Sequence, residues 1–424
     1  MQNKASRVKN YFHSKVIPFF LRGGGAALSF ISTILVSRYL GAHDSGIYYV
    51  SLNIISVLSV VANFGFNTMI LKQVSDQYID KSRESILISS SLYCALAIAF
   101  LFFALIFLIA NVNGEKDLYW TLLLMSPAIF FMACSNSFAS YLQAKERFTP
   151  MVIIQSFAVP AILIFCIWLL HFLNTIDYNK IIIISSIYLL SCILVFIYAI
   201  CSAKAEGDFQ FLKCSIKFKH GTFKYAMINI IIIALSQGVV IINGYFLSYS
   251  ELSKVIVAQK IALLFNFVTT TIVMLFIPKM INSFKNNKKE FFKIARKCKK
   301  IAIITNALMA IVVYITANYI ISIYGESFDG ASVNLKILVL FQLINAYCAV
   351  NGSILLYIDN ENILLKIYVA ALSISILFAL TSPFLFGNSN VIACISLGLS
   401  VITVNVFSTI RLFFISPVKI TNEG

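Results

Sequence analysis

Charged residues are scarce in this sequence, and among them Asp and Glu are fewer than Lys and Arg. Asp, Glu, Lys and Arg make up 12% of the chain, about half of their usual share in a soluble protein, whereas hydrophobic residues make up 60%. This composition excludes an ordinary soluble protein. The chain is therefore expected to be an integral membrane protein that crosses the bilayer many times.

The sequence also lacks the spacings that mark metal and redox sites. The nine cysteines form no CxxC pair and lie mainly in apolar runs, and the four histidines are scattered. We therefore predict no metal site and no cofactor. The net charge of +16 would suggest nucleic acid for a soluble chain, but here most cations lie between apolar runs, so no nucleic-acid partner is expected.

Twelve apolar runs of about twenty residues have the length of membrane-spanning helices. They are Val16–Ser37, Gly46–Leu71, Ile86–Ala110, Leu118–Leu142, Met151–Phe172, Ile181–Ile200, Phe223–Ile242, Val255–Ile277, Ile301–Ile321, Leu335–Ile358, Ile363–Phe386 and Val391–Ile415. The first run follows basic residues, as in a secretory signal, but it has no clear small-residue cleavage site, so we expect an uncleaved span. The predicted fold class is an all-α integral membrane protein of twelve helices.

The distribution of Lys and Arg predicts the orientation, because cytoplasmic loops retain these residues. Of the 33 Lys and Arg residues, 26 fall in segments on one side, and we assign that side and both termini to the cytoplasm. Two cations, Arg22 and Lys260, belong to neither side, and we assign them to the membrane. The others lie on the outer side: Arg38, Lys116, Lys180, Lys254 and Lys336.

Two pseudo-symmetric lobes of six helices around a central cavity are expected, residues 1–208 and 209–424. A polar stretch, Ser202–Gly221, separates the sixth run from the seventh, and a shift of 207 residues superposes several positions. This shift places Leu40 on Leu247, Asp44 on Glu251, Ile54 on Ile261 and Lys72 on Lys279. Six helices per repeat give parallel repeats, a transporter arrangement with the substrate site at the repeat interface.

Polar residues at helical spacing occur on the first two helices of each predicted lobe. Polar side chains in a membrane helix face protein or water, so these stripes predict the substrate-binding residues. The alternatives are hydrogen bonds that only pack the helices, and snorkelling of the two cations to lipid headgroups. The candidate residues are Arg22, Lys260, Asn63, Asn67, Asn229, Gln237, Asn243, Gln259 and Asn266.

The candidate site holds cations but no carboxylate, because all seventeen Asp and Glu residues fall in predicted loops or at helix ends. This charge pattern favours an anionic substrate over a cationic drug and over a buried acidic proton relay. Tyrosines near the outer ends are expected to form an interfacial belt or to stack on sugar rings: Tyr39, Tyr48, Tyr49, Tyr245 and Tyr249. The basic connector Lys279–Lys300 is expected to lie against anionic lipid.

Several segments carry a resemblance to a known family. The first is Arg38–Tyr48, an Arg-x-Leu-Gly turn that ends in Gly-x-Tyr, in which Ala42 stands in place of a frequent proline. The others are Gly65–Lys72, Gln143–Phe148 and Tyr324–Phe328, the last followed by Leu335–Leu338. In this order they resemble the polysaccharide or O-antigen flippases of the multidrug/oligosaccharidyl-lipid/polysaccharide exporter superfamily. The resemblance covers the whole chain in helix count and layout.

The resemblance implies a flippase that moves undecaprenyl-pyrophosphate-linked oligosaccharide across a bacterial inner membrane by alternating access. Arg22 and Lys260 would then contact the pyrophosphate or acidic sugars. The implied partners are the lipid-linked oligosaccharide, membrane lipids and polysaccharide polymerase machinery. A coupling ion, H+ or Na+, is left open, with Asp44 and Glu251 the nearest carboxylates.

Three other functions are alternatives to this one. A related exporter could carry drugs or the peptidoglycan lipid precursor. A carboxylate in the first or seventh helix would favour a drug pump, and neither predicted helix contains one. A membrane polysaccharide polymerase or ligase would need long outer loops, whereas the longest outer connectors here are about a dozen residues. The chain is therefore expected to be a transporter and not an enzyme.

Overall fold

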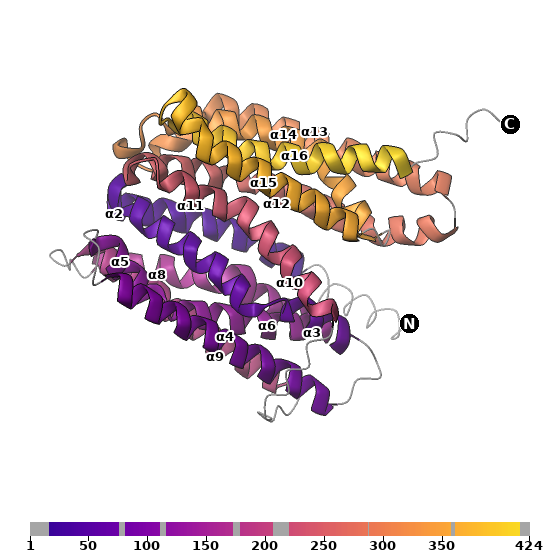
Figure 1. Cartoon of the computed structure of the whole chain (residues 1–424), viewed down its shortest axis with the longest axis horizontal. Helices are drawn as coiled ribbons and strands as arrows, with labels where there is room; N and C mark the ends of the chain where they lie inside the picture. The colour runs from indigo at the N-terminus through magenta and orange to yellow at the C-terminus, as the bar shows by residue number, and fades with distance from the viewer. Residues whose placement is uncertain are drawn as a thin grey trace, which may run out of the picture. The chain divides into compact units, whose positions relative to one another are not determined.

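The structure is a computed structural model that describes residues 17–75, 81–110, 116–172, 179–206, 220–286, 288–357 and 361–415. All regular secondary structure in these ranges is helical, which confirms the predicted all-α class (Figure 1). The chain divides into two compact units, Met1–Ile233 and Ala234–Gly424. Eleven helices in the described ranges are long and apolar enough to cross a membrane.

The described residues of the first unit form ten helical elements. They are α2 (Ile17–Asn63), α3 (Phe66–Val74), α4 (Lys81–Ala110), α5 (Lys116–Met125), α6 (Ala128–Ala144), α7 (Phe148–Val152), the π-helical turn η2 (Ile153–Phe157), α8 (Ala158–Phe172), α9 (Lys180–Lys204) and α10 (His220–Ile233).

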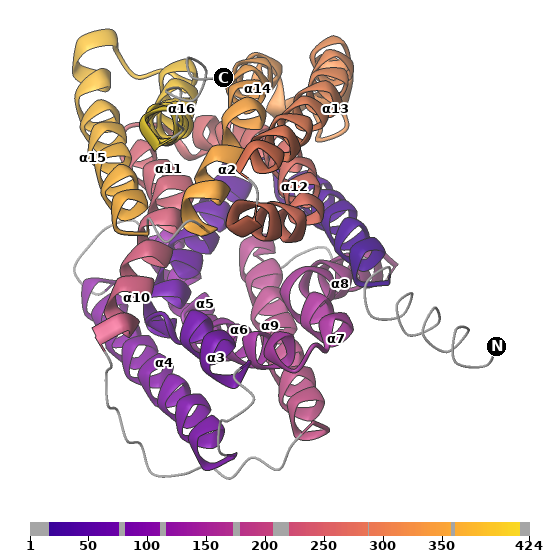
Figure 2. The same ribbon diagram turned by 90° about the vertical axis from the view of Figure 1, so that its right-hand side faces the viewer.

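The described residues of the second unit form eight elements, and Figure 2 labels the α-helices among them. They are the π-helical turn η3 (Ala234–Gly238), α11 (Val239–Gly244), α12 (Tyr249–Asn286), α13 (Lys288–Ser322), the 3-10 turn η4 (Glu326–Phe328), α14 (Ala331–Tyr357), α15 (Glu361–Phe386) and α16 (Asn390–Ile415).

Helix α2 contains two membrane spans. Its apolar part, Phe20–Asn63, would be about 66 Å long if straight, about twice the hydrocarbon thickness. The helix is interrupted at Gly41, whose φ of 76° and ψ of 178° are not helical. The Tyr49 hydroxyl donates to the Thr33 carbonyl oxygen (3.1 Å) and lies 2.9 Å from Ser37 Oγ, so the two halves fold back on each other. The described residues therefore contain twelve candidate spans, as predicted.

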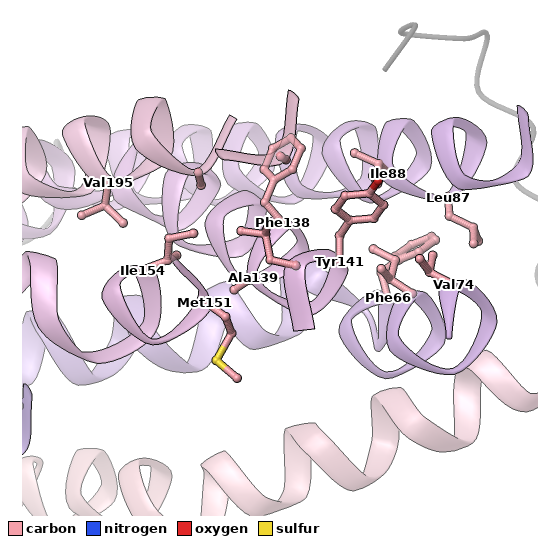
Figure 3. Close-up of a cluster of buried hydrophobic side chains, with 14 of the residues drawn as sticks. Phe66, Val74, Leu87, Ile88, Phe138, Ala139, Tyr141, Met151, Ile154 and Val195 are labelled. Carbon is pink, nitrogen blue, oxygen red and sulfur yellow. The ribbon is translucent and has the colours of Figure 1, made fainter. Parts of the chain in front are cut away.

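Helix α6 forms the centre of the first unit and packs against α2, α3, α4 and α9. Its buried face carries mostly small residues, which let the helix backbones approach closely. Figure 3 shows apolar side chains from α3, α4, η2 and α9 gathered along α6 around Phe138 and Tyr141. Because lipid is as apolar as these side chains, van der Waals packing stabilises this cluster more than the hydrophobic effect does.

Helix α14 has the equivalent central place in the second unit and packs against α12, α13 and α16. Gly398 of α16 lies against α14. A Cβ atom at Gly398 would lie 2.2 Å from the Phe341 ring of α14, far inside van der Waals contact. The glycine therefore makes room for this aromatic ring between the two helices.

Four of the predicted spans depart from a straight α-helix. The second is broken at Phe64 and Gly65, both with positive φ, and its end forms the separate helix α3. The fourth is divided into α5 and α6 by a turn at Ser126 and Pro127. The fifth and the seventh each contain a π-helical turn, η2 and η3. The seventh span, Ala226–Gly244, also crosses the boundary between the two compact units, and the lobe boundary at residue 208 stays a prediction.

Candidate substrate-binding site

Arg22 lies near the start of α2, one turn before a glycine that packs tightly. A Cβ atom at Gly25 would lie 2.7 Å from the Ser156 carbonyl oxygen of η2, whereas Gly23 has no atom within 4 Å of its own Cβ position. Gly25 therefore lets α2 approach the backbone of the π-helical turn. The Arg22 side chain is exposed, and no hydrogen bond or ion pair joins it to another described residue.

Asn63 stabilises the break between α2 and α3. Its Nδ2 donates to the Ala133 carbonyl oxygen (2.8 Å) and to Ser137 Oγ (2.9 Å) of α6, and its Oδ1 accepts from the backbone N–H of Asn67 (2.9 Å). The side chain is buried, and both of its amide hydrogens are used within the protein. The observed contacts of Asn63 are thus those of a helix cap and an interhelical link.

Asn67 and Asn229 lie close together in the first unit. The Asn67 Oδ1 atom is buried and has no hydrogen-bond partner in the described part of the chain. The next residue, Thr68, accepts a hydrogen bond of 3.3 Å from Asn229 Nδ2 of α10, which packs against α2 and α3. An amide oxygen without a partner beside this pair can accept a hydrogen bond from a ligand hydroxyl.

Gln259 and Lys260 lie on α12 at the level of the π-helical turn η3. Gln259 Nε2 donates to the Ser236 carbonyl oxygen (2.8 Å), which places Gln237 and Lys260 at the same height on neighbouring helices. The Gln237 Oε1 atom is buried without a hydrogen-bond partner. Lys260 is half-buried within an apolar span, and it makes no ion pair with a described carboxylate.

Asn243 and Asn266 differ in how far their amides are used. Asn243 is buried, and its Nδ2 donates to the Val239 carbonyl oxygen (2.9 Å) and to Ser396 Oγ (2.8 Å), which links α11 to α16. Asn266 follows Gln259 by seven residues on α12, is half-buried and makes no hydrogen bond with a described side chain. The free amide of Asn266 is therefore the better candidate for ligand contact.

The site residues can bind an anion and hydroxyl groups, but their types do not suit a metal ion. A Lys or Arg without a carboxylate partner, held in a low-dielectric environment, attracts phosphate or carboxylate groups strongly. Unpaired amide oxygens accept hydrogen bonds from sugar hydroxyls. Within the described ranges, no group of three or more His, Cys, Asp or Glu side chains could hold a metal ion.

The family follows from a match that covers more than half of the chain. A family model described as "Polysaccharide biosynthesis protein" matches residues 19–284. This protein belongs to the polysaccharide biosynthesis protein family. The matched range contains all nine candidate residues, from Arg22 to Asn266.

Solved structures show that this family member has the fold of a known transporter superfamily. An inward-facing MATE family multidrug resistance transporter of the MOP superfamily is 12% identical, with a TM-score of 0.72 over 94% of this chain and 96% of that one. The lipid II flippase MurJ in an inward closed conformation is 14% identical, with a TM-score of 0.74 over 94% and 88%. A MOP superfamily transporter from Pyrococcus furiosus is 12% identical, with a TM-score of 0.67 over 97% and 96%. No curated protein sequence matched.

Two polar features of this protein were not predicted from its sequence. The first links α14 to α16: Asn405 Nδ2 donates to Asn345 Oδ1 (3.0 Å), and Asn351 Nδ2 donates to Thr409 Oγ1 (2.7 Å). The second is Asn53, which is fully buried and has no partner for either amide atom in the described part of the chain. Its position ten residues before Asn63 continues the polar stripe of the second span, so the signal was present.

Two of the predicted outer tyrosines have a different role. Tyr48 and Tyr49 are both buried, and their rings pack edge to face with centroids 5.4 Å apart. The Tyr49 hydroxyl connects the two halves of α2, and the Tyr48 ring contacts Tyr188 of α9. The prediction of an aromatic belt or a sugar-stacking surface is therefore wrong for these two residues. Tyr245, in contrast, is almost fully exposed.

Proposed function

We propose that this protein is a flippase for undecaprenyl-pyrophosphate-linked oligosaccharide, an O-antigen or another surface polysaccharide repeat unit. It moves this lipid-linked substrate across the bacterial inner membrane by alternating access and catalyses no chemical step. Three observations support this proposal: the family match, a fold similar to that of a lipid II flippase, and two cations in apolar spans.

The observation that carries the proposal is the state of Lys260. A cation within an apolar span costs at least about 2.5 kcal/mol on insertion scales, and more when it has no counter-charge. Lys260 is half-buried, it follows Gln259, whose amide donates to the Ser236 carbonyl oxygen of η3, and no described carboxylate compensates it. An anionic substrate group supplies the missing charge, and the pyrophosphate of a lipid-linked sugar is such a group.

In this proposal six of the nine candidate residues contact the substrate, and the other three position the helices. Arg22 and Lys260 bind the pyrophosphate or acidic sugars, and Asn67, Asn229, Gln237 and Asn266 accept or donate hydrogen bonds to sugar hydroxyls. Asn63, Asn243 and Gln259 position the helices that carry them, because their amides already bond to neighbouring elements. Both termini are cytoplasmic in this proposal, in keeping with the distribution of Lys and Arg.

Variants of the two cations test the proposal directly. We expect Arg22→Ala and Lys260→Ala each to lower the rate of flipping on the order of 10- to 100-fold, the effect of losing one charge-assisted hydrogen bond. Matched controls on the same two helices are Arg38→Ala and Lys254→Ala; Lys254 donates instead to the Asp329 carbonyl oxygen (2.7 Å). Full activity in both cation variants and in the double variant would reject the cationic site.

The substrate class needs a separate comparison, because a MATE transporter and a flippase share this fold. Proteoliposomes containing the purified protein are offered undecaprenyl-pyrophosphate-linked oligosaccharide, the peptidoglycan lipid precursor or a cationic drug. The proposal requires transport of the first substrate, with inhibition by excess lipid pyrophosphate. Transport of the drug alone would instead assign the chain to the multidrug exporters.

A further inference from the structure

Helix α13 has one buried face and one exposed face from Glu290 to Ser322. Small and apolar residues at helical spacing line the buried face: Phe291, Ala295, Cys298, Ala302, Ala310, Val313, Ala317 and Ile321. The exposed face changes character along the helix. It begins with Lys293, Lys297 and Lys300 and continues in the same register with Ile304, Leu308, Ile311 and Ile315. The basic residues and the lipid-facing residues therefore share a single stripe.

The length of α13 places the cations at the membrane surface. Its apolar part, Ile301–Ile321, is about 31 Å long at 1.5 Å per residue, which matches the hydrocarbon core. Lys300 is then at the edge of this core, and Lys293 lies about 10 Å beyond it. The headgroup region is only about 5 to 8 Å thick on each side, so the basic part of the stripe passes through it.

The charges on this part of α13 are predominantly positive. Arg296 is also exposed and lies beside Lys293 and Lys300 on the helix surface, which gives four cations on one face. Glu290, in the first turn, is the one acid in the described part of this helix. Lys299 points elsewhere, because its Nζ lies 6.0 Å from the Tyr347 ring of α14. The basic stripe consists of Lys293, Arg296, Lys297 and Lys300.

We propose that the basic stripe is a binding site for anionic phospholipid headgroups in the leaflet at this end of α13, the predicted cytoplasmic leaflet. Each ammonium or guanidinium group donates to headgroup phosphate oxygens, while the acyl chains lie along Ile304, Leu308 and Ile311. Clustered Lys and Arg next to a membrane span attract anionic lipid in this way. The site faces lipid and does not depend on the proposed transport function.

The test compares two variants of equal net charge. The stripe variant carries Lys293→Gln, Lys297→Gln and Lys300→Gln, and the control variant carries Arg83→Gln, Lys204→Gln and Lys366→Gln, three exposed cations on other helices of the predicted cytoplasmic side. The purified full-length proteins are titrated with phosphatidylglycerol and with phosphatidylcholine, and bound lipid is counted by native mass spectrometry. A third variant, with Arg at the three stripe positions, retains the charge.

We expect the stripe variant to bind phosphatidylglycerol on the order of 100-fold more weakly, at about fivefold per cation removed, with phosphatidylcholine binding unchanged. The control and Arg variants should bind as the unaltered protein does. Equal losses in stripe and control variants would show that net charge alone attracts the lipid and would overturn the site. Unchanged phosphatidylglycerol binding by the stripe variant would also overturn the proposed lipid site. This holds whether or not the variant loses affinity for a lipid pyrophosphate. Single Lys→Gln variants give the same test if the triple variant does not purify.

Discussion

The Lys145 ammonium nitrogen lies 2.6 Å from Glu84 Oε1, and this pair joins the end of α6 to the start of α4. The Glu84 carboxylate is almost fully buried and also accepts a hydrogen bond of 3.4 Å from the Tyr141 hydroxyl. A second pair, Arg147 with Glu206 (2.8 Å), joins the start of α7 to the end of α9. Both pairs lie on the predicted cytoplasmic side of the first unit.

Glu84→Gln should lower the stability of the first unit. The change leaves the half-buried Lys145 ammonium without its carboxylate, at a cost of about 1 to 3 kcal/mol. Thermal unfolding of the purified protein in detergent measures the effect. Glu206→Gln is the control, because more than half of the Arg147 side chain is exposed and such a pair contributes only about 0 to 1 kcal/mol. Equal losses in the two variants would contradict the structural importance of the buried pair.

Gly25→Ala should destabilise the packing of α2 against η2. The added Cβ atom meets the Ser156 backbone oxygen at 2.7 Å, and a backbone atom cannot rotate away as a side chain can. Such overpacking costs about 1 to 3 kcal/mol. Gly23→Ala lies two residues earlier and has open space around the new atom, so its unfolding temperature should stay unchanged or rise. The prediction fails if both variants unfold at the same temperature.

Asn53→Leu should be tolerated, whereas Asn63→Leu should not. Both asparagines are buried on the same stripe, but the Asn53 amide makes no hydrogen bond with a described residue and the Asn63 amide makes three. Removing an unpaired buried amide is expected to leave stability unchanged or to raise it by about 1 kcal/mol, and removing a bonded one should lower it by about 1 to 3 kcal/mol. Denaturation in mixed micelles compares the two, and a larger loss for Asn53→Leu would reverse this assignment.

The twelve spans could be predicted from the sequence because lipid requires long continuous apolar runs. The same rule identified Arg22 and Lys260, since an ionisable residue is conspicuous within such a run. Local departures from the α-helix were harder to predict. The π-helical turns η2 and η3 and the break at Phe64 depend on partners distant in sequence, such as Gln259 for the Ser236 carbonyl oxygen.

The distinction between packing and binding residues also required three-dimensional contacts. Asn63, Asn67 and Asn243 look alike in the sequence, each on a polar stripe of an apolar helix. The amides of Asn63 and Asn243 donate to groups on neighbouring helices, whereas the Asn67 oxygen is left without a partner. Periodicity places a residue on a face of its helix, but it does not indicate which atom on the adjacent helix lies opposite.

The most direct measurement of the central claim follows lipid-linked glycan in each leaflet of cells that lack this protein, with sensitivity to cationic drugs scored in parallel. The proposed function predicts that undecaprenyl-pyrophosphate-linked oligosaccharide accumulates on the cytoplasmic leaflet while drug sensitivity stays unchanged. Reintroducing the protein should restore export, and reintroducing the variant with both Arg22→Ala and Lys260→Ala should not. Normal glycan export together with drug hypersensitivity would contradict the proposal and indicate a drug exporter.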